Sequence, residues 1–450
     1  MRSRAISVVG LLLAAHLCFS TVLSQGTGTR AATPLQAVCL PMVCNEAPLT
    51  LRFWHTEDPE KSRGKLLEEI TSDFEKEYPW IVIESSYQGH SFELYRKITE
   101  AISAGTPPDL AEADTTYVSE YMASGAVKAL DDYINDPEIG LTVEDFGDIF
   151  PGHFAECRFP QFGNQYLAFP FKKSLLGMWH NMDLLKAAGW ESPPETWQEF
   201  EQACKDITEK TEARGYAYYA SPSIFSAWLF SRGAELLDED QTEAVFNGPE
   251  GVESLDMLLR LIECGAAWNP GSYHDLSEFA EGNAAFTMSS TSGTSYYSRA
   301  IEDYGNVVEE WGQTVVPQSD PANPKTLVYG TSLCVFKTTE AKQRAAWLFI
   351  KYFTDTAQTA KWGSQSGYMP VRASAAALLE DYFADNPVAK EQFEDIVPYG
   401  KPEPAVRGEQ EIRDFIYDAM VAAFSEIMTP QEALDEAVEL ANEALARGRE

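Results

Sequence analysis

Side chains suited to holding a polar small molecule stand at the ends of predicted strands. Trp54 and Tyr87 offer flat faces on which a sugar ring can stack, and Asp114 offers a carboxylate for ligand hydroxyl groups. Tyr368 supplies another aromatic hydroxyl, and Gly330 lies where backbone groups can approach a ligand closely. Together these residues favour recognition of a ligand over the breaking of a bond.

Hydroxyl groups add to this set from two other places in the chain. Ser174 lies within the mostly apolar stretch 166–181, and Ser290 and Ser292 belong to the hydroxyl-rich run 289–295. Each of these serines taken alone is more often structural. Their position at predicted strand ends places them with the aromatic residues.

The sequence lacks the motifs of several enzyme classes. It contains no phosphate-binding P-loop, no dinucleotide glycine fingerprint and no Gly-x-Ser-x-Gly elbow. Its six histidines include no pair at metal-ligand spacing. We expect neither a catalytic residue nor a metal or other cofactor. A secreted polysaccharide hydrolase, which needs a pair of carboxylates, and a structural envelope protein are the alternatives.

The formal charge of −35 over 450 residues argues against nucleic acid and anionic membranes as partners. With 44% hydrophobic residues, a chain of this length can bury a large core and divide into two or three domains. These values indicate a soluble globular protein.

The N-terminus predicts export. Arg2 and Arg4 precede the apolar run 8–23, so we interpret residues 1–24 as a signal peptide, with a retained membrane anchor as the alternative. Residues 25–48 are rich in Thr, Gly, Ala and Pro and predict a flexible tether. The folded protein is expected in the periplasm or attached to the cell surface.

Export permits disulfide bonds among the seven cysteines. Cys204 and Cys264 lie on two predicted helices of one region, and Cys39 and Cys44 are close in sequence. These are the candidate pairs, and burial as small hydrophobic residues is the alternative.

The elements that must position the polar side chains follow a β-α-β-α-β order at the start of the fold. Strands are expected at 49–55, 81–87 and 109–113, with amphipathic helices between them. This order predicts a mostly parallel sheet, and ligands bind such sheets outside the carboxyl ends of the strands.

A second α/β unit is expected from residue 196, where Thr196 begins a helix to 214. A strand at 327–336 and a helix at 340–355 return to the first sheet, and the chain from about 373 is expected to be helical. The stretch 166–181 predicts one strand. Its Pro170 and its Lys172-Lys173 pair suit an edge strand with a solvated charge pair as well as a binding segment.

Several sequence motifs together resemble one family, the extracellular solute-binding proteins of carbohydrate ABC importers of the maltose-binding type. The motifs are Phe53-Trp-His55, Ala104-Gly-Thr-Pro-Pro-Asp109 and the ranges 74–82, 179–185 and 193–197, and they occur in the family's order. The resemblance covers roughly residues 49–447. Further motifs at 87–89, 170–174, 330–333, 367–370 and 411–413 are most similar to the members that bind glycerol-3-phosphate.

The resemblance implies an α/β, periplasmic-binding-protein-like fold with two lobes and mixed, mostly parallel sheets. Residues 49–169 and 330–368 would form lobe 1, and residues 170–329 and 369–450 lobe 2. Segments at 169–173, 326–329 and 369–370 would cross between the lobes as a hinge. A monomer that closes on its ligand and is recognised by membrane permease subunits is implied.

The ligand contacts that the resemblance implies are Tyr87, Asp114, Ser174, one of Ser290 to Ser292, Gly330, Tyr368 and Arg413. The planar guanidinium of Arg413 is suited to a phosphate or carboxylate. One segment departs from the family, because Ala220-Ser-Pro-Ser-Ile-Phe225 has no tryptophan where the glycerol-phosphate binders carry one. The expected ligand is therefore a sugar, a polyol or a sugar phosphate, with glycerol-3-phosphate or a glycerophosphodiester as the specific alternative.

Overall fold

The computed structural model describes residues 47–271 and 274–449. The predicted signal peptide, and all of the predicted tether except residues 47 and 48, lie outside this part of the chain. Among the described residues, no helix is both long and apolar enough to cross a bilayer.

The first sheet has five strands in the order β2-β1-β3-β13-β6. Strands β1, β2 and β3 are parallel, while β13 and β6 join them as antiparallel neighbours. The strands are β1 Leu49–His55, β2 Ile81–Tyr87, β3 Leu110–Ala113, β6 Phe169–Pro170 and β13 Ser332–Val335.

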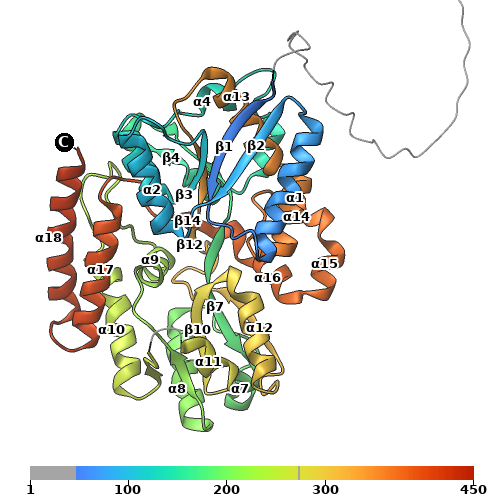
Figure 1. Ribbon diagram of the computed structural model, residues 1–450. Coiled ribbons are helices and arrows are strands. Elements are labelled where there is room, and N and C mark those ends of the chain that lie inside the picture. The colour runs from blue at the N-terminus through green and yellow to red at the C-terminus, as the bar shows by residue number, and fades with distance from the viewer. Residues whose placement is uncertain (1–46, 272–273, 450) are drawn as a thin grey trace, which may run out of the picture. The chain divides into compact units, whose positions relative to one another are not determined.

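Helices cover both faces of this sheet because its strands alternate between two cores. Leu51 and Phe53 point to a core shared with helices α1, α13 and α14, and Ala111 and Ala113 point to a core shared with α2 and α3. Figure 1 shows α1 and α2 on either side of β1 and β2. These helices are α1 Ser62–Glu77, α2 Ser91–Ser103, α3 Thr115–Ala123, α13 Glu340–Phe353 and α14 Thr356–Ser366.

The second sheet has seven strands and is centred on β7, whose eight residues are all buried. Strand β7 pairs with β10 on one edge and with β11 and β12 on the other. The strands are β7 Ser174–Asn181, β8 Arg214–Ala217, β9 Ala267–Trp268, β10 Ala284–Ser290, β11 Trp311–Val315, β12 Thr326–Tyr329 and β14 Gly400–Pro402.

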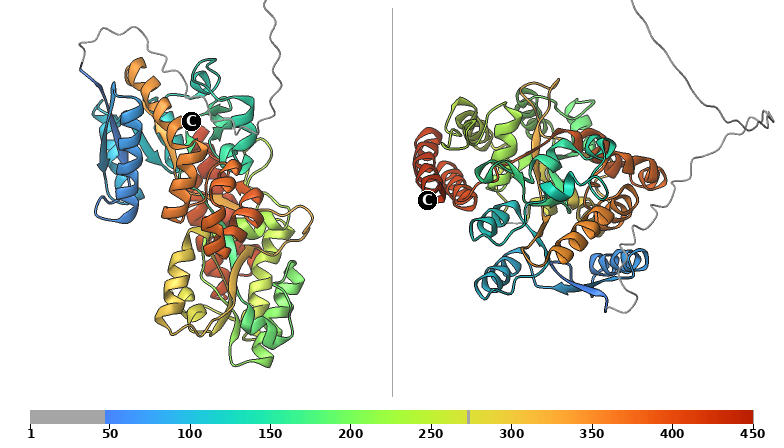
Figure 2. Two further views of the ribbon diagram at one scale, coloured as in Figure 1. Left: turned by 90° about the vertical axis from the view of Figure 1, so that its right-hand side faces the viewer. Right: turned by 90° about the horizontal axis from the view of Figure 1, so that it is seen from above.

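Five longer helices, together with the short helix α7 Met182–Ala188, form the large core of this second sheet. Helices α17 and α18 lie side by side at its outer edge (Figures 1 and 2). Thr196 caps the first of the five as predicted, accepting a hydrogen bond of 3.2 Å from the amide of Glu199. The five are α8 Trp197–Lys210, α9 Pro222–Ser231, α10 Pro249–Glu263, α17 Glu409–Phe424 and α18 Pro430–Arg449.

Shorter helices and a small hairpin complete the fold. The hairpin pairs β4 Arg158–Phe159 with β5 Gln165–Tyr166. The helices are α4 Asp131–Ile134, α5 Val143–Asp148, α6 Pro151–Ala155, α7 Met182–Ala188, α11 Asp275–Ala280, α12 Thr294–Asp303, α15 Glu380–Asp385 and α16 Pro387–Asp395. Short 3-10 helices lie at Pro160–Phe162, Thr291–Gly293, Ala373–Leu378 and Val397–Tyr399.

The predicted fold class, α/β with two mixed sheets, is confirmed, and several element predictions need correction. The stretch 166–181 is not one strand, since β5, β6 and β7 are separate. The predicted strand 327–336 breaks at Gly330 into β12 and β13, and the C-terminal region contains β14 besides helices. Cys204 and Cys264 are both free, so their candidate disulfide is wrong, while Cys39 and Cys44 lie outside the described residues.

Candidate functional site

Two neighbouring segments carry the chain from one sheet to the other. One joins β6 to β7 through residues 171–173, and the other joins β12 to β13 through Gly330 and Thr331. The amide of Lys172 donates a hydrogen bond of 3.1 Å to the carbonyl of Thr331, which ties the two segments together. Gly330 has a φ of +119°, and a Cβ there would lie 2.1 Å from the carbonyl oxygen of Lys172. The two segments therefore approach so closely that position 330 requires glycine, which has no side chain and adopts a positive φ readily.

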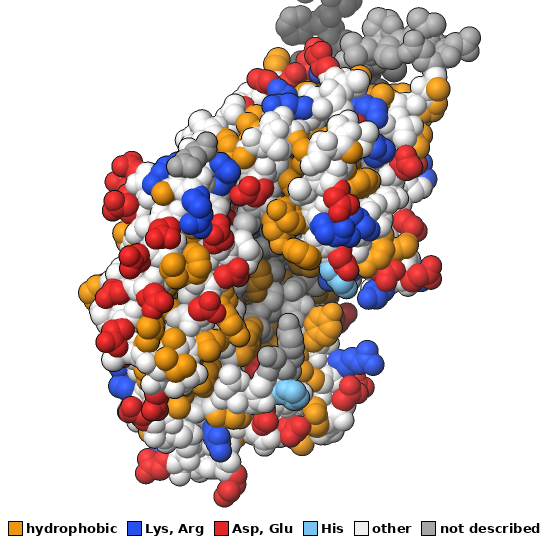
Figure 3. Space-filling model, turned by 60° about the vertical axis from the view of Figure 1, so that its left-hand side comes forward, with side chains coloured by type: hydrophobic (Ala, Val, Ile, Leu, Met, Phe, Trp, Pro, Cys, Tyr) orange, Lys and Arg blue, Asp and Glu red, His pale blue; other side chains and the backbone are white. Residues whose placement is uncertain are grey.

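A cavity of about 270 Å³ lies beside these segments, and we call it the acidic cavity. Its walls come from elements of both sheets, and Figure 3 shows one face of the molecule hollowed between its upper and lower parts. The lining residues are Asp114, Thr115, Thr116, Tyr117, Glu156, Ser223, Val328, Tyr329, Gly330, Glu403, Glu409, Gln410 and Arg413.

The cationic groups at this cavity are held by carboxylates of the chain. Arg413 forms an ion pair with Glu403 and donates a hydrogen bond of 2.8 Å to the Ser223 hydroxyl. The charge of Glu403 raises the pKa of Arg413. Lys173 pairs with Glu156 at 2.6 Å and also donates to the Gly330 carbonyl at 2.9 Å.

The other carboxyl groups of the cavity bind protons more tightly than usual. Burial raises the pKa of Glu409 to about 8, and the charge of Glu403 adds to the effect while Arg413 opposes it. Burial likewise raises the pKa of Glu156 to about 7, against the attraction of Lys173. Burial and the charge of Glu112 raise the pKa of Asp114. Near neutral pH, Glu409 and Glu156 can therefore donate as well as accept hydrogen bonds.

Tyrosines give the cavity an apolar wall. The ring of Tyr117 stacks on that of Tyr95 with centroids 4.2 Å apart, which fixes its orientation. Tyr329 ends strand β12, and burial raises the pKa of its hydroxyl to about 12. Rigid aromatic rings beside carboxyl groups are suited to a ring-shaped polar solute.

The structure brings three of the predicted site residues to the acidic cavity. Asp114 follows β3, Gly330 lies on the second crossing segment, and Arg413 projects from α17. They come from distant parts of the sequence.

The predicted serines lie outside the cavity lining. Ser174 is buried at the start of β7, where its backbone is paired with Tyr329. The hydroxyl groups of Ser290, the last residue of β10, and Ser292, in the turn that follows, are 2.8 Å apart. Ser290 also has a hydrogen-bond interaction with the hydroxyl of Tyr329, so it contacts a residue of the cavity wall.

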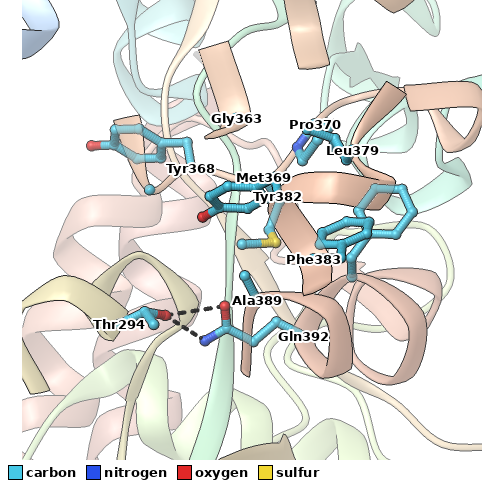
Figure 4. Close-up of a pocket in the computed structure, with 12 residues that line it drawn as sticks. Thr294, Gly363, Tyr368, Met369, Pro370, Leu379, Tyr382, Phe383, Ala389 and Gln392 are labelled. Carbon is cyan, nitrogen blue, oxygen red and sulfur yellow. Dashed lines mark hydrogen bonds between the residues drawn. The ribbon is translucent and has the colours of Figure 1, made fainter. Parts of the chain in front are cut away.

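The predicted aromatic residues also lie outside the cavity lining. Trp54 packs against the core on the α2 face of the first sheet, and Tyr87 is exposed at the end of β2. Tyr368 lines a second, much smaller pocket with Met369, Pro370 and Phe383 (Figure 4).

Lys172 and Lys173 are buried, with 3% and 0% of their surface exposed, so the alternative of a solvated pair on an edge strand is wrong. The ammonium of Lys172 lies 2.6 Å from Glu57 and also pairs with Glu112. These carboxylates raise the pKa of Lys172, and neither lysine has a charge left for an anionic ligand.

Three carboxyl groups of the cavity, Glu156, Glu403 and Glu409, were missed by the sequence analysis. In a chain with 69 acidic residues nothing about their spacing distinguishes them. The departing segment 220–225 reaches the site through Ser223 in the first turn of α9, whereas Trp228, further along the same helix, is buried in the core.

This chain resembles known proteins over most of its length. Residues 69–391 match the model of the family described as bacterial extracellular solute-binding protein. The sn-glycerol-3-phosphate-binding periplasmic protein UgpB of Escherichia coli K12 is 25% identical over 426 residues, covering 89% of this chain and 94% of that protein.

Two solved structures share the fold. The cyclic alpha-maltosyl-1,6-maltose binding protein of Arthrobacter globiformis aligns with a TM-score of 0.78 and 22% identity, over 89% of this chain and all (100%) of that one. UgpB of Mycobacterium tuberculosis, in complex with glycerophosphocholine, aligns with a TM-score of 0.71 and 20% identity, over 90% of this chain and 99% of that one. The chain therefore belongs to the bacterial extracellular solute-binding proteins, a non-catalytic family.

Proposed function

We propose that this protein is the capturing component of an ABC importer for a sugar or related polyol. It binds the solute in the acidic cavity as a monomer and delivers it to permease subunits in the membrane. The observation that carries the proposal is the cavity itself, where Asp114, Tyr329 and Arg413 from separate elements face one space beside both crossing segments.

Capture proceeds by closure of two lobes, residues 49–169 with 330–368 and residues 170–329 with 369–450. The chain passes from one sheet to the other at 171–173 and at Gly330 to Thr331, which supports lobe boundaries near these positions. A rotation about the crossing segments would bring the cavity walls together on the solute and bury its hydroxyl groups. The closed form is the one that the permease recognises.

Binding of glycerol-3-phosphate or a glycerophosphodiester is the second candidate. The identity to the glycerol-3-phosphate-binding protein of E. coli and the presence of Arg413 favour it. Against it, Glu403 already neutralises Arg413, and a phosphate would face the other carboxyl groups of the cavity. We therefore place the neutral sugars and polyols first.

Calorimetric titration with a panel of mono- and disaccharides, polyols and glycerol-3-phosphate tests the proposal. At least one sugar or polyol should bind, and small-angle X-ray scattering should show that the protein becomes more compact with it. Absence of both binding and compaction with every member would overturn the proposed function. Tight binding of glycerol-3-phosphate alone would establish the second candidate.

A further inference from the structure

Only some of the carboxyl groups in the acidic cavity are paired with a cationic side chain of the protein. Of its four carboxyl groups, Glu156 is paired with Lys173 and Glu403 with Arg413. Within residues 47–271 and 274–449, no ion pair reaches Asp114 or Glu409. Two carboxyl groups that face the same cavity are therefore open to a cation from outside the chain.

Glu409 also has an unused hydrogen-bonding atom. Its side chain is buried, with 7% of the residue exposed, and its Oε2 has no hydrogen-bond partner among the described residues. The carboxyl group does have a hydrogen-bond interaction with Thr116. A buried acceptor without a partner is costly and uncommon in folded proteins, so a bound donor would stabilise this position.

We infer that the solute carries a protonated amino group, which Asp114 and Glu409 recognise in the acidic cavity. The inference rests on the proposed function and specifies the ligand as an amino sugar or an aminocyclitol. An ammonium group supplies up to three hydrogen-bond donors and the missing positive charge, whereas a hydroxyl group supplies one donor and no charge. The ring that carries the amino group would stack on Tyr117.

Proton release on binding should accompany recognition of the ammonium group. Glu409 faces Glu403, Glu156 and Arg413, and the raised pKa values of Glu409 and Glu156 mean that the empty cavity retains protons near neutral pH. An arriving cation favours the charged carboxylates, so protons leave. At about pH 6, where amino groups stay protonated, calorimetry in two buffers of different ionisation enthalpy should detect this release for amino solutes alone.

Matched pairs of solutes test the inference. The β-1,4 disaccharide of glucosamine differs from cellobiose by amino groups in place of the 2-hydroxyl groups, and galactosamine differs from galactose in the same way. Kanamycin represents the aminocyclitols. At least one amino solute should bind about tenfold more tightly than its neutral partner, or with measurable affinity in the case of kanamycin.

The variant Glu409→Gln removes the charge and keeps the shape of the side chain. It should lower the affinity ratio of each amino and neutral pair, with Asp114 alone left to recognise the ammonium group. Glu411→Gln is the control, because Glu411 lies on the same helix but is exposed and paired with Arg447 outside the cavity. Thermal unfolding of each variant shows whether it is folded.

Each outcome has a defined meaning. Neutral solutes that bind as tightly as their amino partners, or an unchanged ratio in folded Glu409→Gln, contradict the inference and leave the proposed function standing. Absence of binding by every amino and every neutral solute overturns both.

Discussion

The guanidinium group of Arg413 is held by the carboxylate of Glu403 at the wall of the acidic cavity. Its second terminal nitrogen donates to Ser223, so both ends of the group are occupied by the chain. A residue that would bind an anion in two places is thereby neutralised before any ligand arrives.

Removing the negative charge of Glu403 should increase the affinity of the cavity for anionic ligands. In Glu403→Gln the charge of Arg413 is no longer cancelled, so affinity for glycerol-3-phosphate should rise at least about tenfold over wild type. Calorimetry measures the change, with Glu235→Gln as the control because Glu235 is exposed and pairs with Lys401 away from the cavity lining. Equal affinity in wild type and Glu403→Gln would show that the ion pair does not decide ligand charge.

Lys172 is predicted to be important for stability. Its ammonium group pairs with Glu57 and Glu112, which are both buried, and donates a hydrogen bond of 2.9 Å to Thr56. Lys172→Met leaves the buried carboxylate of Glu112 without a cation, while Glu57 keeps Arg63 at 3.2 Å, and should lower the free energy of unfolding by about 3–5 kcal/mol in urea titrations. The double variant with Glu112→Gln should recover part of this loss, and an equal or larger loss would contradict the prediction.

Gly330 should not tolerate a side chain. Gly330→Ala combines a positive φ with a Cβ placed 2.1 Å from a backbone oxygen, so we expect a loss of about 3 kcal/mol or more. Gly105→Ala is the matched control, since its φ is +71° but no atom lies within 4 Å of the added Cβ. That control should lose only about 1 kcal/mol in urea titrations. Similar losses in both would show that crowding at the crossing has no effect.

The pH dependence of stability should report on Glu409. Its pKa of about 8 in the folded protein lies above the ordinary value of 4.5, so the folded state binds this proton more tightly than the unfolded state. The stabilisation is complete below about pH 4.5 and is lost as the pH rises through 8.

Glu409→Gln removes this dependence. Relative to wild type, the variant should become more stable with rising pH, by roughly 5 kcal/mol above pH 8, since each pKa unit corresponds to about 1.4 kcal/mol. Thermal unfolding of both proteins across the pH range measures the difference, and a difference that stays constant with pH would contradict the prediction.

The sequence predicted the strands that its hydrophobic pattern specifies locally. Strands β1 and β2 occupy the predicted ranges 49–55 and 81–87, because period-two alternation and flanking helices determine such elements. The apolar pattern alone missed the breaks at 171–173 and at Gly330, because it does not reveal that the chain leaves one sheet and enters another. Crossings at 169–173 and 326–329 were implied only by the family resemblance.

The cavity was only partly predictable for a similar reason. Asp114 was expected to bind ligand because it follows a parallel strand, where ligands commonly lie. Glu409 and Glu403 acquire their roles from long-range packing of the C-terminal region against the crossing segments, which no local pattern encodes. The sequence left Lys172 between a solvated edge-strand pair and a binding segment, because the buried acids that hold it are distant in sequence.

Hydrogen exchange with and without a pool of amino sugars, neutral sugars, polyols and glycerol-3-phosphate tests the central claim, that the solute binds in the acidic cavity. Protection should increase at residues 114–117, 328–330 and 403–413, which line the cavity, and stay unchanged in helix α13. Unchanged exchange throughout, or protection confined to the second pocket at residues 363–393, would contradict the claim.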